Sequence, residues 1–361
     1  MRGTMARSSH TPPAMRDVAR AAGVHQTTVS RALRNDPRIP EATRLRIVRI
    51  AESLQYRPDP LVSALIARRR SRHPPRYPIC LAFVAYMSTH YRRYAPHQYT
   101  YEAHLAGARF AAERQGYQVE LFPMNSPDMT PRRLDEILST RNIPGLIIGS
   151  LPEGRGGFSL SWERFCTVVI EYTFTSPALD RVVHDSYDGM RRIMQQCRSL
   201  GLKRVGLMLT ATGHERTERL NVAAYWVEQK DEKFFPPVPP LIVPLWDPQA
   251  VTVWHRRHRL EAIVTSNALL PGLMAWCEQR GLRPGVDLLV LNVNAAVEGA
   301  VAGIYQDPFT IGATAARLVI EKIGRNDRGV PAIRQTVLTQ GRWVAGQGEV
   351  VAAEAAGKTP R

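Results

Sequence analysis

The chain has 361 residues, of which 44% are hydrophobic and 22% charged, a composition typical of a soluble globular protein with two or three domains. No apolar run reaches the roughly 18–20 residues of a membrane helix, and the polar, proline-bearing N-terminus has no apolar signal core. We therefore expect a cytoplasmic protein with no membrane partner. The cysteines show no C-x-x-C spacing, which indicates buried free thiols at Cys80, Cys166, Cys197 and Cys277.

The net charge of +16 is concentrated near the N-terminus. Residues 1–76 hold 16 arginines, no lysine and five acids, a net charge of +11, whereas the remaining 285 residues carry only +5. Such asymmetry is the electrostatic footprint of a phosphate-binding module, and a merely solvated basic face does not predict it.

Residues 15–34 predict two short helices that share one small core. Apolar side chains recur there at helical spacing, at Val18, Ala19, Ala22, Val24, Val29, Ala32 and Leu33. Gly23 lies between the helices and permits the positive φ that a tight interhelical turn can need. If Val29 and Leu33 face inward, the second helix exposes Gln26, Thr27, Ser30 and Arg31. Helices that read base edges in the DNA major groove carry such a face, although an ordinary helical hairpin matches the same short pattern.

The flanking segments complete the N-terminal region. Residues 1–14 are expected to be a disordered extension, and residues 41–54 predict a third helix after the turn-rich loop 35–40. Pro40 and Glu41 suit the first turn of that helix. Residues 61–67 can form a further short helix, followed by an arginine tract at 68–72. A seven-residue helix is not stable alone in water, so it must form against a partner.

From Tyr77 onward the pattern alternates between strand and helix. Strands are predicted at 79–86, 117–122, 145–150, 167–172, 204–210, 241–245, 261–266, 287–293 and 302–306. Helices are predicted at 100–115, 130–140, 187–200, 216–229, 249–258, 268–280 and 308–324. This alternation indicates doubly wound parallel sheets covered on both faces, and nine strands fit two lobes better than one sheet. The expected ligand site is then the cleft between the lobes.

Several motifs resemble the lac-repressor (LacI-type) family of bacterial transcription regulators. They are DVARAAGVHQTTVSRAL at 17–33, RIPEATR at 38–44, LQYRP at 54–58, VTSN at 264–267, GLRPGVDL at 281–288, YQDPFTIG at 305–312 and GRWV at 341–344. The resemblance covers about residues 15–345 and is most specific at its N-terminal end. It implies an all-α helix-turn-helix headpiece joined by a hinge helix to an α/β two-lobed domain like that of periplasmic binding proteins.

The resemblance also implies a domain division. The headpiece is residues 15–57, the hinge helix and basic linker 58–76, the two-lobed domain 77–345 and a flexible tail 346–361. Within the two-lobed domain, one lobe takes about 77–185 and 304–324, and the other takes about 186–303 and 325–345.

The family functions as a homodimer that binds a palindromic operator in double-stranded DNA. The base-reading positions carry over to Gln26, Thr27 and Arg31, with phosphate or supporting contacts from His25, Thr28 and Ser30. Arginine can fork onto guanine, so Arg31 is the expected single-base reader, although a phosphate contact is the open alternative. The minor-groove wedge of the hinge helix carries over to Leu65, with Val62 beside it. Pro60 and Val62 depart from the commoner hinge pattern.

The effector cleft departs most from the family pattern. Family members mostly bind sugars or nucleobases, but the usual aspartate after the strand 287–293 is missing. Candidate cleft residues are Tyr86, Arg216, Arg219, Asn267, Asn292 and Asn294, and each could equally serve packing or a structural hydrogen bond. Arg216 and Arg219 compete for the family's cleft arginine, because no glycine fixes the register there.

The sequence predicts no enzyme, catalytic residue, metal or cofactor, since no nucleophile, phosphate-loop or paired-carboxylate signature is present. His255 and His258 lie one helical turn apart without an acidic or thiol partner, so they are interpreted as surface histidines. The predicted function is a DNA-binding transcription regulator, a repressor, controlled by a small molecule such as a sugar or sugar derivative. A ligand-insensitive or activating regulator and, more remotely, a solute-binding protein remain open alternatives.

Overall fold

The computed structural model describes residues 13–33, 36, 38–54, 56, 79–86, 95–126, 128–151, 154–230, 237–297 and 299–346. Several predicted features lie outside these ranges: the hinge residues Pro60, Val62 and Leu65, the arginine tract at 68–72, the extension before residue 13 and the tail from 347. Among the described residues, no helix is both long enough and apolar enough to cross a membrane. The four cysteines are free; three are buried and Cys80 is half-buried.

Three helices form the headpiece: α1 (Met15–Ala22), α2 (Gln26–Leu33) and α3 (Glu41–Ser53). Gly23 ends α1 with φ 61°, and across this turn the Val24 amide donates to the Ala19 carbonyl at 3.0 Å. The shared core consists of Val18, Ala19, Ala22, Val29, Ala32, Ile47 and Ala51. The predicted helices are therefore confirmed. Helix α3 buries Ile47 and Ala51 in this core, whereas Leu45, an apolar residue of the same helix, is exposed.

The first lobe, the N-lobe, is built on a six-stranded sheet whose paired strands all run parallel, in the order β2-β1-β3-β5-β7-β13. Its strands are β1 (Ile79–Ala85), β2 (Tyr117–Pro123), β3 (Gly145–Ile148), β5 (Cys166–Ile170), β7 (Arg181–His184) and β13 (Thr336–Thr339). Successive strand residues face opposite cores. One core packs beneath α5 (Ala95–Glu113) and α12 (Pro308–Arg325), and the other beneath α6 (Pro131–Thr140) and a 3₁₀ turn, η2 (Trp162–Arg164).

The second lobe, the C-lobe, repeats this plan in the order β14-β12-β11-β10-β8-β9. Its strands are β8 (Val205–Thr210), β9 (Leu241–Val243), β10 (Ala262–Thr265), β11 (Leu289–Asn292), β12 (Ala302–Tyr305) and the antiparallel β14 (Arg342–Val344). Helices α7 (Ser186–Ser199) and α9 (Leu220–Gln229) cover one face, and α10 (Pro248–His258) and α11 (Leu270–Gln279) cover the other. The predicted pair of doubly wound sheets is confirmed.

The chain crosses between the lobes three times: from β7 into α7, from β12 into α12, and from β13 into β14. The third crossing corrects the sequence-based division, which assigned all of 325–345 to the C-lobe. Thr336–Thr339 pairs with β7 in the N-lobe, and the chain returns to the C-lobe only at β14. Of the last two strands, β13 thus belongs to the N-lobe and β14 to the C-lobe.

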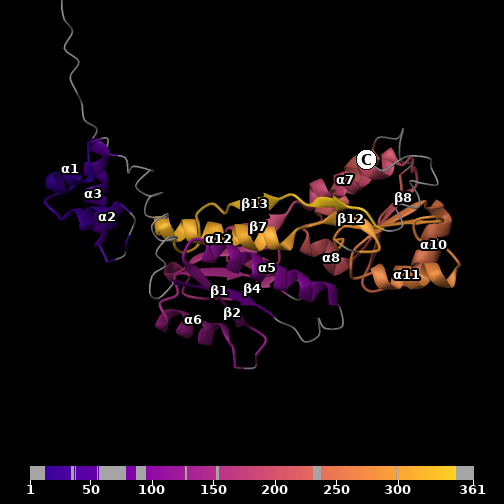
Figure 1. Ribbon diagram of the computed structural model, residues 1–361, viewed down its shortest axis with the longest axis horizontal. Coiled ribbons are helices and arrows are strands. Elements are labelled where there is room, and N and C mark those ends of the chain that lie inside the picture. Colours follow the sequence, from indigo (N-terminus) through magenta and orange to yellow (C-terminus); the bar gives the residue numbers. More distant parts are fainter. Residues whose placement is uncertain are drawn as a thin grey trace, which may run out of the picture.

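Helices α5 and α12 lie side by side along the N-lobe sheet (Figure 1). Two glycines allow their close approach. A Cβ on Gly107 would lie 1.9 Å from the Phe309 carbonyl oxygen, and one on Gly312 would lie 1.9 Å from the His104 carbonyl oxygen. Because each contact is with the backbone of the facing helix, no side-chain adjustment could relieve the clash.

A helix predicted at 216–229 is divided in the structure. Helix α8 (Ala211–Arg216) ends at a turn in which Glu218 (φ 49°) and Arg219 (φ 63°) are both left-handed, and α9 follows. A short pair of strands, β4 (Gly156–Gly157) and β6 (Phe174–Ser176), also lies outside the predicted set. The turn between α8 and α9 faces the N-lobe, where it makes the contacts described below.

Candidate functional site

Helix α2 presents a polar face beside the headpiece core. Val29 and Ala32 are buried, while Gln26, Thr27 and Arg31 are exposed. The sequence therefore folds so that three hydrogen-bonding side chains project together from one side of a short helix. Glutamine and arginine are the side chains that pair with two atoms of adenine and guanine, respectively, in the major groove.

The other three headpiece candidates are His25, which contacts the start of α2, and Thr28 and Ser30 within the helix. His25 precedes the helix, and its carbonyl accepts the Thr28 amide at 2.9 Å. The His25 Nδ1 lies 2.9 Å from the Thr27 Oγ1 and accepts the Thr27 amide at 3.3 Å. Thr28 and Ser30 are half-buried between this surface and the core. The structure thus gathers all six headpiece candidates on one helix and the residue before it.

The lobes meet through Arg216, at the end of α8 in the C-lobe. Its guanidinium donates to the Leu151 carbonyl and, at 2.8 Å, to the Ser150 Oγ, both in the N-lobe. Arg219, the competing candidate, is exposed and pairs with Glu215 at 2.8 Å on its own lobe. The two left-handed residues after α8 rotate the chain so that Arg216 faces the N-lobe and Arg219 does not.

Ser150 belongs to a small polar network at the carboxyl end of β3. Its Oγ lies 3.1 Å from the Thr173 Oγ1, which accepts the Leu151 amide at 2.8 Å. The Tyr101 hydroxyl donates to the Ser150 carbonyl at 2.9 Å. The oxygen atoms that receive Arg216 are therefore held in place by the N-lobe itself.

The asparagines at the carboxyl ends of β10 and β11 bond to one another. The Asn292 amide nitrogen donates to the Asn267 Oδ1 at 2.6 Å, and the Asn292 Oδ1 accepts the Asn294 amide at 2.9 Å. Asn292 is buried, so it shapes this loop. Tyr86 follows β1, and its half-buried ring packs against the N-lobe core, where burial raises the pKa of its hydroxyl.

Glu171 lies within electrostatic reach of Arg216 and is not among the residues that the sequence predicts for this region. It follows β5 with φ 69°, a conformation that is costly for a residue with a side chain and is found at functional sites. Burial raises the pKa of its carboxyl to about 7, although the charge of Arg216 acts in the opposite direction. The sequence signal for Glu171 is an acid near the end of the apolar run TVVIEY, which lies within the strand predicted at 167–172.

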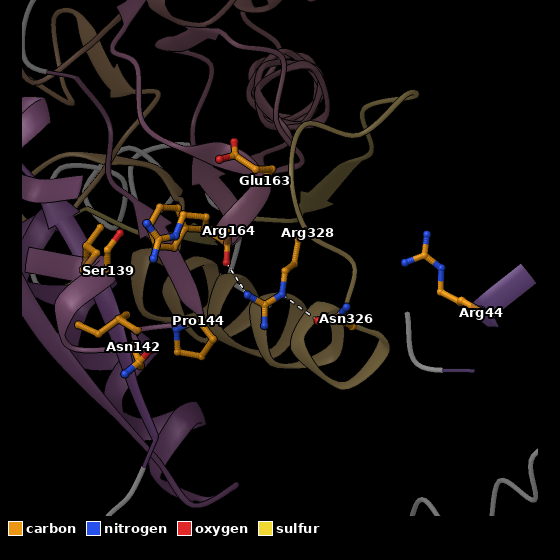
Figure 2. A pocket seen from close by; sticks show the side chains of 11 residues that line it. Arg44, Ser139, Asn142, Pro144, Glu163, Arg164, Asn326 and Arg328 are labelled. Atoms are coloured by element: carbon orange, nitrogen blue, oxygen red, sulfur yellow. Dashed lines mark hydrogen bonds between the residues drawn. The ribbon is translucent and has the colours of Figure 1, made fainter. Parts of the chain in front are cut away.

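A hollow of about 640 Å³ lies at the edge of the N-lobe sheet where β3 and β5 begin, away from Ser150 and Glu171 (Figure 2). Pro144 and Phe165 line it, and they immediately precede β3 and β5. Arg328 crosses one side, donating to the Arg164 carbonyl at 2.6 Å and to the Asn326 Oδ1 at 2.8 Å. Because parallel strands place their carboxyl ends at the other edge, this hollow is separate from the residues around Glu171 and Arg216.

A helix-turn-helix headpiece followed by a two-lobed domain of the periplasmic-binding-protein type defines the class of this protein. Residues 14–59 match the model described as "Bacterial regulatory proteins, lacI family". The headpiece is therefore a LacI-family helix-turn-helix domain.

Two curated relatives carry the names of transcription regulators. The chain is 26% identical over 188 residues to the HTH-type transcriptional regulator PtxS of Pseudomonas plecoglossicida, covering 52% of this chain and 51% of PtxS. It is 49% identical over 45 residues to the probable HTH-type transcriptional repressor ExuR of Bacillus subtilis (strain 168), covering 12% of this chain and 14% of ExuR. The chain thus spans about half the length of PtxS and a small part of ExuR.

Solved structures share the whole architecture at low identity. The transcriptional regulator CelR in complex with cellobiose has a TM-score of 0.54 and 18% identity, covering 92% of this chain and 98% of that one. The lac repressor dimer bound to operator and the anti-inducer ONPF has a TM-score of 0.54 and 16% identity, covering 94% and 99%. At these identities the likeness establishes the fold.

Proposed function

We propose that this chain is a sequence-specific DNA-binding transcription regulator, a repressor whose operator affinity is set by a small molecule between the lobes. The observation that carries the proposal is the LacI-family headpiece, whose α2 exposes Gln26, Thr27 and Arg31 together. We propose residues 15–57 as the DNA-binding domain, 58–76 as the hinge and linker, and 77–345 as the effector domain. The relative solved on operator DNA, the lac repressor, supports this division.

On DNA, Arg31 forks onto a guanine, and Gln26 and Thr27 contact neighbouring base edges. His25, Thr28 and Ser30 contact phosphates or support the reading helix. Two headpieces in a homodimer read the two halves of a palindrome. Leu65, with Val62 beside it, inserts into the minor groove between them. The excess of positive charge in residues 1–76 supports the phosphate contacts.

The effector occupies the cleft between the lobes, where Glu171, Ser150 and Arg216 provide an acid, a hydroxyl and a guanidinium within one region. Relatives of the same fold were solved with cellobiose and with D-xylulofuranose, which supports a sugar or sugar derivative here. Ligand binding changes the relative population of lobe arrangements, and the hinge carries this change to the headpieces. The effector must bind one arrangement more tightly than the other, since equal affinity shifts nothing.

Selection of bound duplexes from a random DNA pool with the full-length protein tests the DNA-binding role. The expected result is enrichment of one palindromic sequence, whose affinity falls as salt concentration rises. Recovery of unrelated sequences with equal affinity would refute it. A thermal-shift screen of sugars then tests effector binding, and repeating the DNA titration with each stabilising sugar shows whether that sugar alters operator affinity.

A further inference from the structure

A second contact between the lobes lies beside the Arg216 contact. Glu218, in the turn between α8 and α9 of the C-lobe, places its carboxylate between two N-lobe arginines. Its Oε1 lies 2.6 Å from the Arg155 Nη2 and 3.5 Å from the Arg181 Nη1. A carboxylate from one lobe thus occupies a position defined by two guanidinium groups of the other.

Arg181 is built into the N-lobe. Its side chain is 3% exposed, its Nε donates to the Thr336 Oγ1 at 3.2 Å, and its guanidinium stacks over the Tyr172 ring at 4.8 Å. A surface arginine lacks this support, whereas a fixed, planar fork suits recognition of a carboxylate or phosphate. The packing therefore holds one half of the arginine pair rigidly.

The charges around Arg181 do not balance. Burial lowers the pKa of Arg181, and the nearby charge of Arg334 lowers it further. Among the described residues, Glu218 is the carboxylate within ion-pairing distance of both Arg155 and Arg181, so one acid faces two guanidinium groups at this contact. A buried cation with a positive neighbour is stabilised by an additional anionic group.

The internal carboxylate is also held under strain. Glu218 and Arg219 are consecutive non-glycine residues with positive φ, a conformation that costs free energy at each residue. Glu218 and Arg155 remain about one-third exposed, so solvent and small solutes can reach their ion pair. A ligand that replaced this carboxylate would release the strained turn from the N-lobe.

We propose that Arg155 and Arg181 form an anion-binding site for the effector. A carboxylate or phosphate group of the effector binds there in place of Glu218. This inference rests on the proposed function, because it takes the anion to be part of the effector. It specifies the class of ligand as an organic acid or a phosphate ester, and it couples ligand binding to separation of Glu218 from the N-lobe.

The test uses the full-length protein and two small anions as probes, inorganic phosphate and acetate, against chloride at equal ionic strength. Glu218→Gln removes the internal carboxylate, and Glu215→Gln is the matched control because it removes the same charge one helical turn away. We expect phosphate or acetate to raise the melting temperature of Glu218→Gln by roughly 2–4 °C more than that of Glu215→Gln. The more effective probe indicates whether the effector carries a phosphate or a carboxylate.

A protein of net charge +16 binds anions at many places, so the comparison between variants of equal charge decides the matter. Adding Arg155→Ala to Glu218→Gln must abolish the additional stabilisation. If both anions raise the melting temperatures of Glu218→Gln and Glu215→Gln equally, the proposed anion-binding site is wrong. It is also wrong if adding Arg155→Ala leaves the response of Glu218→Gln unchanged. Failure of the regulator proposal gives a different result. If anions bind at Arg155 and Arg181 but the protein shows no sequence-selective DNA binding, the anion-binding site stands and only the regulatory role is rejected.

Discussion

Arg216 of the C-lobe donates a hydrogen bond to Ser150 of the N-lobe, with 2.8 Å between the Nη2 and Oγ atoms. The same guanidinium bonds to the Leu151 carbonyl and acts electrostatically on Glu171. One side chain therefore joins the C-lobe to the polar network at the carboxyl edge of the N-lobe sheet.

Arg216→Ala should loosen the lobe interface. Hydrogen bonds to a charged donor contribute about 1.5–3 kcal/mol each, whereas an exposed ion pair contributes about 0–1 kcal/mol. We expect Arg216→Ala to lower the free energy of unfolding by about 2 kcal/mol or more, measured by urea denaturation. Arg219→Ala serves as the control, since it removes the same charge from an exposed pair. Similar effects of the two substitutions would contradict the assignment of Arg216 to the interface.

Arg31→Ala should remove discrimination at one base pair of the selected operator. The expected loss is about 1–3 kcal/mol for the preferred sequence, with little change for sequences altered at that base pair. Fluorescence anisotropy with a set of single-base operator variants measures this. Arg46→Ala, an exposed arginine on α3, is expected to weaken all sequences evenly. If Arg31→Ala also weakens every sequence evenly, Arg31 contacts phosphate.

Buried histidines should make stability depend on pH. Burial lowers the pKa of His104 to about 3 and that of His184 to about 4, so both stay neutral in the folded protein at pH 5–6. The unfolded chain binds these protons, so the free energy of unfolding falls as the pH drops through this range. Glu171, with a pKa raised to about 7, acts in the opposite sense, because its folded form keeps a proton that the unfolded chain releases.

Two substitutions separate these effects through the slope of stability against pH between pH 5 and 6. His104→Leu should reduce the slope by about 1.4 kcal/mol per pH unit, and Glu171→Gln should increase it by a similar amount. Urea denaturation at several pH values measures both slopes. Because the slope is compared, a uniform loss of stability from repacking does not affect the result. Unchanged slopes would mean that the two groups titrate alike in the folded and unfolded states.

Lys322 should contribute strongly to the free energy of unfolding, because its ammonium group is buried in the N-lobe and paired with two carboxylates. Its Nζ lies 2.6 Å from the Asp180 Oδ2 and 3.1 Å from the Asp327 Oδ2, and its side chain is 2% exposed. Lys322→Met leaves the Asp180 carboxylate buried without its cation, which costs about 3–5 kcal/mol. Arg325→Met breaks an exposed pair with Glu321 on the same helix and should change stability by less than about 1 kcal/mol.

The sequence predicts the lobes well because strands buried on both faces are continuous apolar runs. The stretch from Ile79 to Ala85 and that from Ala262 to Thr265 are of this kind. Strand β13 carries no such signal. It lies at the edge of the sheet with alternating exposure, and its partner β7 is about 155 residues earlier in the chain. Pairing over that separation cannot be read from local pattern.

The side chains at the contact between the lobes are less predictable from the sequence, for a different reason. The choice between Arg216 and Arg219 depends on the left-handed backbone at Glu218 and Arg219, which no glycine announces. In the sequence Glu171 looks like an ordinary strand residue, and only the fold brings the charge of Arg216 near its carboxyl group. By contrast, the faces of α2 follow from the alternation of Val29 and Ala32 with polar neighbours, so the headpiece surface was visible in the sequence.

The crossing between β13 and β14 limits how the lobes can move. Only Gln340 and Gly341 separate the two strands, and a Cβ on Gly341 would lie 2.5 Å from the Ile304 Cγ2 and 2.8 Å from the His184 Cε1. Three connections, at this short link and at the entries to α7 and α12, therefore limit how far the lobes can separate or slide. Rotation about these connections changes the fewest backbone dihedral angles, so we expect an effector to act by turning one lobe relative to the other.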